Sequence, residues 1–101
     1  GFSTAAADMK DRALREARVE AERMLEATRT ALKADGDLLS PDKRAEIDHL
    51  MTQIGQRCDR GELESLESST KALAHATEAF AAERMNRSIR QALAGRQLDQ
   101  L

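Results

Sequence analysis

Aromatic residues, proline and cysteine are scarce in this chain of 101 residues, which has two phenylalanines, no tryptophan or tyrosine, one proline and one cysteine. A single cysteine excludes an internal disulfide and is typical of a reducing, cytoplasmic setting. Scarce aromatic residues, together with abundant alanine, glutamate, arginine and leucine, disfavour sheets and favour helices. The composition therefore predicts an all-α protein.

Long apolar runs and an excess of one charge are also missing. No stretch approaches the ~18 apolar residues of a membrane span, and no signal peptide is visible. The formal net charge of −2 gives no basic surplus for nucleic acid. A chain of this size buries a modest core, and it has no P-loop, nucleophile elbow or zinc spacing. We therefore expect one domain over 1–101 with no catalytic, metal or cofactor-binding residues and no nucleic-acid or membrane partner.

The longest periodic stretch predicts a helix over 8–34, with apolar residues recurring at steps of three and four. Alanine lines its first half and buries little area, whereas each large side chain of its second half contributes roughly 1.5–3 kcal/mol when buried. We therefore expect the first half to project as an arm and the second half to join a bundle. The arm should be exposed along one face, through which copies of the chain would self-associate: Met9, Leu14, Ala17 and Ala21.

Turn residues divide the rest of the chain. Gly36 offers a left-handed position that would end the first helix. Ser40 as cap and Pro41 in the first turn predict a second helix over 41–58, followed by Gly61.

No glycine or proline occurs from Glu62 to Ala94, so a third helix is expected over 62–94, either continuous or bent between 74 and 82. Gly95 would close it, and 96–101 would be a polar tail. The predicted fold is a long projecting N-terminal helix plus a small antiparallel bundle of three to four helices. The large apolar side chains on the facing stripes are expected in the bundle core: Met24, Leu25, Leu32, Leu39, Ile47, Leu50, Met51, Ile54, Leu63, Leu66, Leu73, Phe80 and Ile89.

Three groups of residues are candidates for chemistry. Glu46 and His49 have the Glu-x-x-His spacing of di-iron bundles, but such sites need a second copy, and His75 has no glutamate three residues before it. We therefore favour a surface histidine beside carboxylates. Cys58 is either a reactive thiolate or, as we favour, a small buried hydrophobe. An arginine strip could meet phosphate, but cations at a helix C-terminus explain it more simply: Arg84, Arg87, Arg90 and Arg96.

Two stretches resemble a known family. Residues 16–40 read EARVEAERMLEATRTALKADGDLLS and residues 78–95 read EAFAAERMNRSIRQALAG, followed by the short tail 96–101. Together they resemble the C-terminal helical lid of the HscA family, the DnaK-type chaperones of bacterial iron–sulfur cluster assembly. The likeness covers essentially the whole chain. The block that separates this family from general DnaK chaperones, whose extreme C-terminus is a longer disordered tail, is Phe80–Met85 with Ser88, Arg90, Ala92, Leu93 and Gly95.

The resemblance implies a non-catalytic lid in the bacterial cytoplasm. In that family a separate nucleotide-binding domain hydrolyses ATP with magnesium, a β-sandwich domain grips a peptide of the iron–sulfur scaffold protein, and a J-domain co-chaperone assists closure of the lid. Neither of those domains is in this chain, whose first residues lack an initiator methionine, so we expect a fragment of a longer protein.

DnaK relatives latch the lid onto the β-sandwich through polar side chains midway along the long helix. The corresponding zone, expected to face away from the bundle, holds four candidate contacts: Arg18, Glu22, Arg23 and Glu26. A histidine of that latch falls near Glu26 here, so its chemistry does not carry over unchanged. The alternative for this zone is a solvated face of paired charges.

Three other functions fit the same pattern less well. The chain could be the lid of a general DnaK-type chaperone, a stand-alone helical adaptor, or a small metal-dependent bundle enzyme. An intact chain without upstream domains would favour the adaptor, and stoichiometric iron or manganese would favour the enzyme.

Overall fold

The computed structural model describes the backbone of residues 2–100 and the side chains of residues 5–95. Within that range every regular element is helical, and no strand is present. The prediction of an all-α fold, with one long helix beside a small bundle, is confirmed. The elements in chain order are α1 (Phe2–Asp35), the short 3-10 turn η1 (Gly36–Leu38), α2 (Pro41–Arg60), α3 (Leu63–Ala76) and α4 (Glu78–Gln100).

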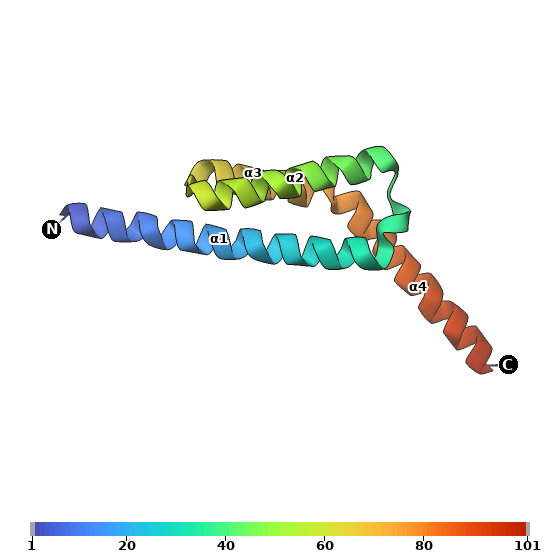
Figure 1. Cartoon of the computed structure of the whole chain (residues 1–101). Helices are drawn as coiled ribbons and strands as arrows, with labels where there is room; N and C mark the ends of the chain where they lie inside the picture. The colour runs from blue at the N-terminus through green and yellow to red at the C-terminus, as the bar shows by residue number, and fades with distance from the viewer. Residues whose placement is uncertain (1, 101) are drawn as a thin grey trace.

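The helices are arranged around α1, which runs most of the length of the molecule (Figure 1). Helices α2 and α3 lie side by side along one side of α1, and α3 packs against both of its neighbours. Helix α4 leaves the bundle near the end of α1 and projects away from it. The molecule is elongated as a result, with principal extents of 72 × 30 × 17 Å.

Local signals set both ends of α2. The hydroxyl oxygen of Ser40 accepts a hydrogen bond from the backbone N–H of Lys43 at 3.2 Å, and Pro41 occupies the first turn. Gly61 has a φ of 71°, in the left-handed region, and its N–H donates to the carbonyl of Arg57 at 3.1 Å. The start of α2 is as the sequence predicted, whereas its end lies two residues beyond the predicted bound of 58, at Arg60.

Gly36 does not act as predicted. Among the described residues the only positive φ belongs to Gly61, and the chain leaves α1 through η1 instead of a left-handed turn. A Cβ atom at this position would lie 3.0 Å from Nη1 of Arg44, the far end of a flexible side chain that can move aside, so this contact by itself does not require a glycine in the turn.

The long helical stretch near the C-terminus is broken at Thr77. Its hydroxyl donates to the carbonyl oxygens of Leu73 at 2.9 Å and Ala74 at 3.1 Å, which satisfies the end of α3. Of the two alternatives for 62–94, the structure has the broken one, with the break inside 74–82.

Helix α4 continues through Gly95 to Gln100, so the predicted end at Gly95 is wrong. A glycine within a helix costs about 1 kcal/mol relative to alanine, which neighbouring alanine, leucine and glutamine residues outweigh. For the predicted polar tail 96–101, the side chains of 96–100 and all of residue 101 lie outside the described residues.

The core runs between α1, α2 and α3 and is closed by Phe80 of α4. Ile47, Ile54, Leu66 and Leu73 are fully buried. Leu63 is half-buried at the edge, where it lines a shallow groove with Lys10. The other expected core residues that are buried or pack against the core are Met24, Leu25, Leu32, Leu39, Leu50, Met51 and Phe80.

The expected exposed arm is mostly covered. Met9 is 72% exposed, but Ala21 is fully buried, and Leu14 and Ala17 pack against the core. The prediction that Ala21 is exposed is wrong because small side chains let α3 come close to α1, so that a thin face becomes a close-packed one. Of the four residues predicted to mediate self-association, Met9 alone is exposed enough to contact a second copy.

Ile89 was expected in the core and is 50% exposed. Its stripe on α4 is periodic, but α4 projects away from the bundle (Figure 1), and within the described part of the chain Met85, Ile89 and Leu93 are left exposed. No helix within residues 2–100 is long and apolar enough to pass through a lipid bilayer.

Candidate interaction surfaces

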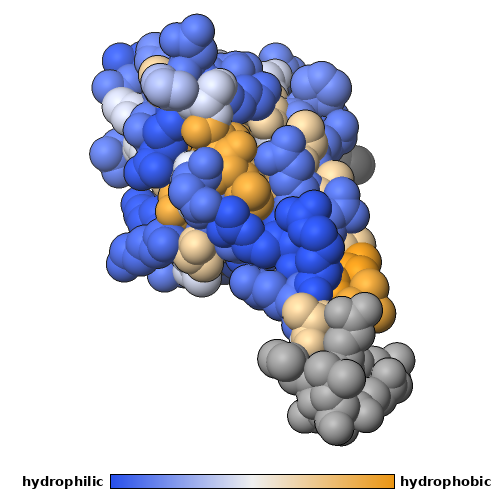
Figure 2. Space-filling model, turned by 90° about the vertical axis from the view of Figure 1, so that its right-hand side faces the viewer, coloured by the Kyte–Doolittle hydropathy of each residue, from blue (hydrophilic) through white to orange (hydrophobic). Residues whose placement is uncertain are grey.

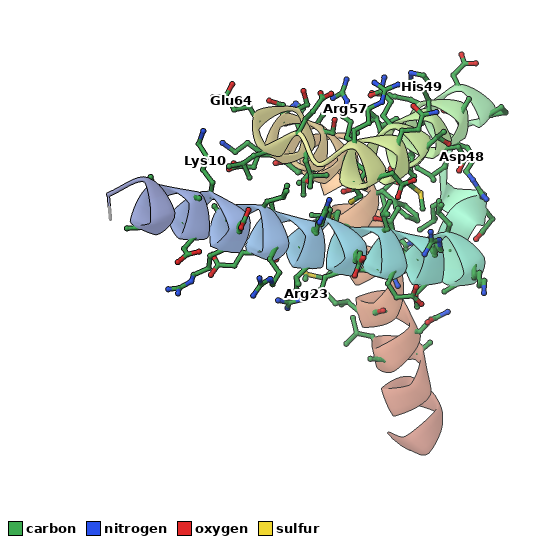
Figure 3. All side chains as sticks on the ribbon, turned by 60° about the vertical axis from the view of Figure 1, so that its left-hand side comes forward. Lys10, Arg23, Asp48, His49, Arg57 and Glu64 are labelled. Atoms are coloured by element: carbon green, nitrogen blue, oxygen red, sulfur yellow. The ribbon has the colours of Figure 1, made fainter. Side chains whose placement is uncertain are left out.

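The outer face of α1 is left bare by the bundle. Val19 is 51% exposed on it. Arg23 points to the side of α1 away from α2 and α3 (Figure 3) and lies 3.8 Å from Glu20. Glu26 pairs with Arg29 at 3.4 Å. Such exposed pairs are worth about 0–1 kcal/mol each, so this face presents polar groups that can change partners at little cost.

Arg18 and Glu22 do not belong to that face, although the sequence placed all four candidate latch residues together. The Arg18 Nε–H donates to the carbonyl oxygen of Cys58 at 3.1 Å and thereby binds α1 to the end of α2. Glu22 follows Arg18 by four residues and therefore lies on the same side of α1, and, second to burial, its negative charge raises the pKa of the Cys58 thiol. The prediction that Arg18 faces away from the bundle is therefore wrong. Arg23 and Glu26 remain as candidates on the outer face.

Cys58 is held in its thiol form. Burial raises its pKa, the negative charge of Glu22 raises it further, and the opposing effect of Arg18 is smaller. Arg57, close to it in sequence, is turned toward α3, where it donates to the carbonyl of Ser65 at 3.3 Å and to the hydroxyl of Ser69. The alternative of a reactive thiolate lacks the cationic setting that it needs.

Glu46 and His49 are occupied by neighbours on their own helix. Glu46 pairs with Lys43 at 3.1 Å, and His49 lies 3.1 Å from Nε2 of Gln53. The part of the chain with described side chains contains no group of three histidine, cysteine or acidic residues placed to hold a metal ion.

The arginine strip of α4 has a structural role that sequence reasoning missed. Arg84 Nε lies 2.8 Å from Asp35, and Arg87 bridges Asp35 at 3.0 Å and Asp37 at 2.6 Å. We call these four residues the elbow cluster, since they join the end of α1 and η1 to α4. The prediction that these arginines complement the C-terminal dipole of their own helix is wrong for this pair. The sequence does show two acidic residues, Asp35 and Asp37, at the turn after α1. No local pattern, however, indicates that the arginines of α4 lie beside them.

Arg87→Met is expected to lower the melting temperature, and the loss should depend on pH. A hydrogen bond from Arg84 lowers the pKa of Asp35 most, followed by one from Arg87, which also lowers the pKa of Asp37. Carboxylates with lowered pKa values stabilise the fold above their ordinary value of 3.8, and that contribution is lost as the pH falls through the folded-state pKa. Thermal melts of the variant and the parent should therefore differ at pH 7 and converge below pH 4.

Arg90→Met is the matched control, because Arg90 is an exposed arginine on the same helix. It should melt like the parent protein at every pH. A constant difference between the Arg87 variant and the parent from pH 7 to pH 2 would contradict the role of the elbow cluster.

Two apolar features remain. A shallow groove of ≈ 240 Å³ between α1 and α3 is lined by Ala17, Glu20, Glu67, Thr70 and Lys71. On α4, Met85, Ile89 and Leu93 are each at least 50% exposed. Figure 2 shows hydrophobic surface on the projecting segment beside the grey C-terminal atoms.

Comparison with known proteins gives one consistent result. The Hsp70 protein family matches residues 2–86. Relatives from Methylibium petroleiphilum and Paracidovorax citrulli, each named chaperone protein HscA homolog, are 57% and 54% identical over all 101 residues. A relative of the same name from Verminephrobacter eiseniae is 56% identical over 100 residues, 99% of this chain. The chain spans 16% of the length of each of these relatives.

Proposed function

This chain belongs to the Hsp70 protein family, and we propose that it is the helical lid of an HscA-type chaperone, closing over a client peptide held by a β-sandwich domain of the same polypeptide. Its role in this proposal is mechanical: it slows escape of the client, and ATP and magnesium act in a separate nucleotide-binding domain.

The observation that carries this proposal is the two-sided character of α1. The helix is unbroken over 34 residues, which corresponds to about 50 Å at 1.5 Å per residue. One face is clamped by α2 and α3, with Ala21 and Leu25 buried there, while Val19 and Arg23 on the other face are exposed. A helix stiffened along one side, with its other side free, can cover a neighbouring domain without bending.

The chemistry of the outer face suits reversible docking. Val19 offers a small apolar contact, and the surrounding pairs Glu20–Arg23 and Glu26–Arg29 are exposed and weak. Polar groups on the loops of a β-sandwich could replace either partner of such an ion pair, with little loss of free energy. Lids that open and close during a cycle need this balance, since a large buried interface would hold them shut.

The names of the relatives support the finer part of the proposal. They are HscA homologs at 52–57% identity, and the matched region includes the block Phe80–Met85. We therefore propose an iron–sulfur scaffold protein as client, a J-domain co-chaperone as partner, and the bacterial cytoplasm as location. The lid of a general DnaK-type chaperone is the second candidate, which this identity disfavours. The family match also disfavours a stand-alone adaptor.

Peptide dissociation from the whole chaperone tests the proposal. Removing this segment from the longer protein should speed the dissociation of a fluorescent scaffold peptide by about tenfold or more, equivalent to about 1.4 kcal/mol. The association rate should rise as well, because access no longer requires opening. Equal dissociation rates with and without the segment would contradict a lid.

A further inference from the structure

Helix α4 is held to the bundle over its first half alone, among the side chains that the structure describes. Phe80 is 3% exposed, and Arg84 and Arg87 pair with acidic residues at the end of α1 and in η1. Residues 88–95 are all exposed, and the helix projects away from the bundle (Figure 1). The outer half of α4 therefore points wherever the contacts of its first half direct it.

The connection to α3 allows α4 to change direction. Thr77 is the single residue between the two helices, and its φ and ψ are −98° and 1°. These values lie outside the α-helical region. A residue has only two soft backbone dihedral angles, so a modest change of both at Thr77 would swing the whole of α4.

Open space flanks the base of α4 on two sides. A groove of ≈ 160 Å³ lies between it and α1, beside Ala81, and a groove of ≈ 340 Å³ lies between it and the start of α2, beside Ala79. Phe80 lines both grooves. Close packing would hold the helix at one angle, whereas these spaces leave room for α4 to tilt around Phe80.

The apolar and the ionic contacts of α4 differ in what they fix. The ring of Phe80 makes apolar contacts, which are non-directional, so it fixes where α4 begins. Arg87 lies seven residues further along the same face, about 10 Å away at 1.5 Å per residue. Its guanidinium donates to both carboxylate oxygens of Asp37, at 2.9 and 2.6 Å, and to Asp35 at 3.0 Å. Bidentate bonds of this kind have a defined geometry, so they fix the angle of the helix.

The elbow cluster is more accessible to water than the ring. The side chains of Arg84, Arg87 and Asp37 are 37%, 26% and 67% exposed, whereas Phe80 is 3% exposed. Separating exposed ion pairs costs little, because water solvates the freed charges. The cluster can therefore open while the ring of Phe80 stays in place.

We propose that the elbow cluster is an ionic lock on a pivoting helix. Phe80 holds the base of α4, Arg84 and Arg87 set its direction, and α4 swings about Thr77 when their ion pairs open. The two arginines are positioning residues in this account. The inference depends on the contacts around η1 and is independent of the proposed lid function.

The distance between two spin labels, measured by double electron–electron resonance, tests the proposal. In a Cys58→Ser background, labels at Gln56→Cys on α2 and Ala92→Cys on α4 report the direction of α4, since both positions are exposed. The chain with both arginines should give one narrow distance distribution. Replacing Arg84 and Arg87 together by methionine should widen that distribution at least twofold, because the ring contact alone remains. Arg87→Lys, which keeps the charge without the fork of donors, should give an intermediate width.

Arg90→Met is the matched control, because Arg90 is an exposed arginine of the same helix outside the elbow cluster. It should leave the distribution unchanged. Circular dichroism should show equal helicity in all the labelled chains, so that a wider distribution reports a swinging helix. Equal widths with and without the two arginines, or a wide distribution when both are present, would overturn the proposal. Widening that occurs only together with a loss of helicity would show that α4 melts instead of pivoting and would overturn it as well.

Discussion

Replacing Phe80 by alanine is expected to lower the free energy of unfolding by about 3–5 kcal/mol. Phe80 is 3% exposed and fills the angle where α4 meets the bundle. Met24 and Thr28 of α1 line the space on one side of it, and Leu38 and Leu39 line the space on another. The guanidinium of Arg84 also lies 5.9 Å from the ring centroid. Truncation would leave a cavity between three elements that cannot collapse together.

Urea unfolding followed by circular dichroism measures this loss. Small domains have a total stability of about 5–15 kcal/mol, so the variant should lose a large share of its stability and unfold at a clearly lower urea concentration than the parent. Met85→Ala is the control on the same helix, because Met85 is 66% exposed and should change stability little. Equal midpoints for the Phe80 variant and the parent would show that α4 is not anchored by this ring.

Ala21→Glu is expected to be the second most damaging change, at about 3–5 kcal/mol, the usual cost of leaving a buried charge without a partner. Ala21 is fully buried where α1 packs against α3. The longer side chain would separate the two helices or carry its carboxylate into the core. Had α1 projected freely at this point, as its alanine-rich sequence suggests, the same change would be harmless.

Ala27→Glu provides the comparison within the same helix. Ala27 is exposed, and glutamate is a good helix former, so the unfolding free energy should change by no more than about 0.5 kcal/mol. Thermal and urea denaturation of both variants should separate them clearly. Similar stability for the two would mean that α3 does not hold the middle of α1.

Features with a local physical cause could be predicted from the sequence. The cap at Ser40 and the end of α2 before Gly61 depend on neighbouring residues alone; the cap lies where it was predicted, and the helix ends within two residues of the predicted bound. The helical period also identified the fully buried residues Ile47 and Ile54, because apolar residues at this spacing must find a partner surface.

Features set by the path of the chain could not be predicted. Periodicity places Ile89 on an apolar stripe but does not say whether another helix packs against that stripe. Because the chain changes direction at Thr77, α4 projects away from the bundle and Ile89 is left exposed. Because alanine buries little area, the sequence predicted that Ala21 would not pack against another helix. Small residues, however, allow two helices to approach most closely. The elbow cluster joins Asp35 to Arg87 across 52 positions, a pairing that no local pattern encodes.

The same reasoning divides the candidate latch. Arg18 and Arg23 are alike in sequence, but the first binds the end of α2 and the second faces away from the bundle. The two residues are five positions apart, which places them about 140° apart around the helix axis, and only the position of the partner helix reveals which of them faces the bundle. The outer face of α1, centred on Val19, is therefore the part of the proposed lid that is free to meet another domain.

Thiol protection at position 19 tests the lid most directly. The Val19→Cys and His49→Cys variants of the whole chaperone, in a Cys58→Ser background, would be alkylated with and without bound scaffold peptide, and labelling at each position would be followed by mass spectrometry. His49 is exposed on the side of α2 away from α1 (Figure 3). The lid account predicts that bound peptide slows alkylation at position 19 at least tenfold and leaves position 49 unchanged. Equal rates at position 19 with and without peptide would contradict it.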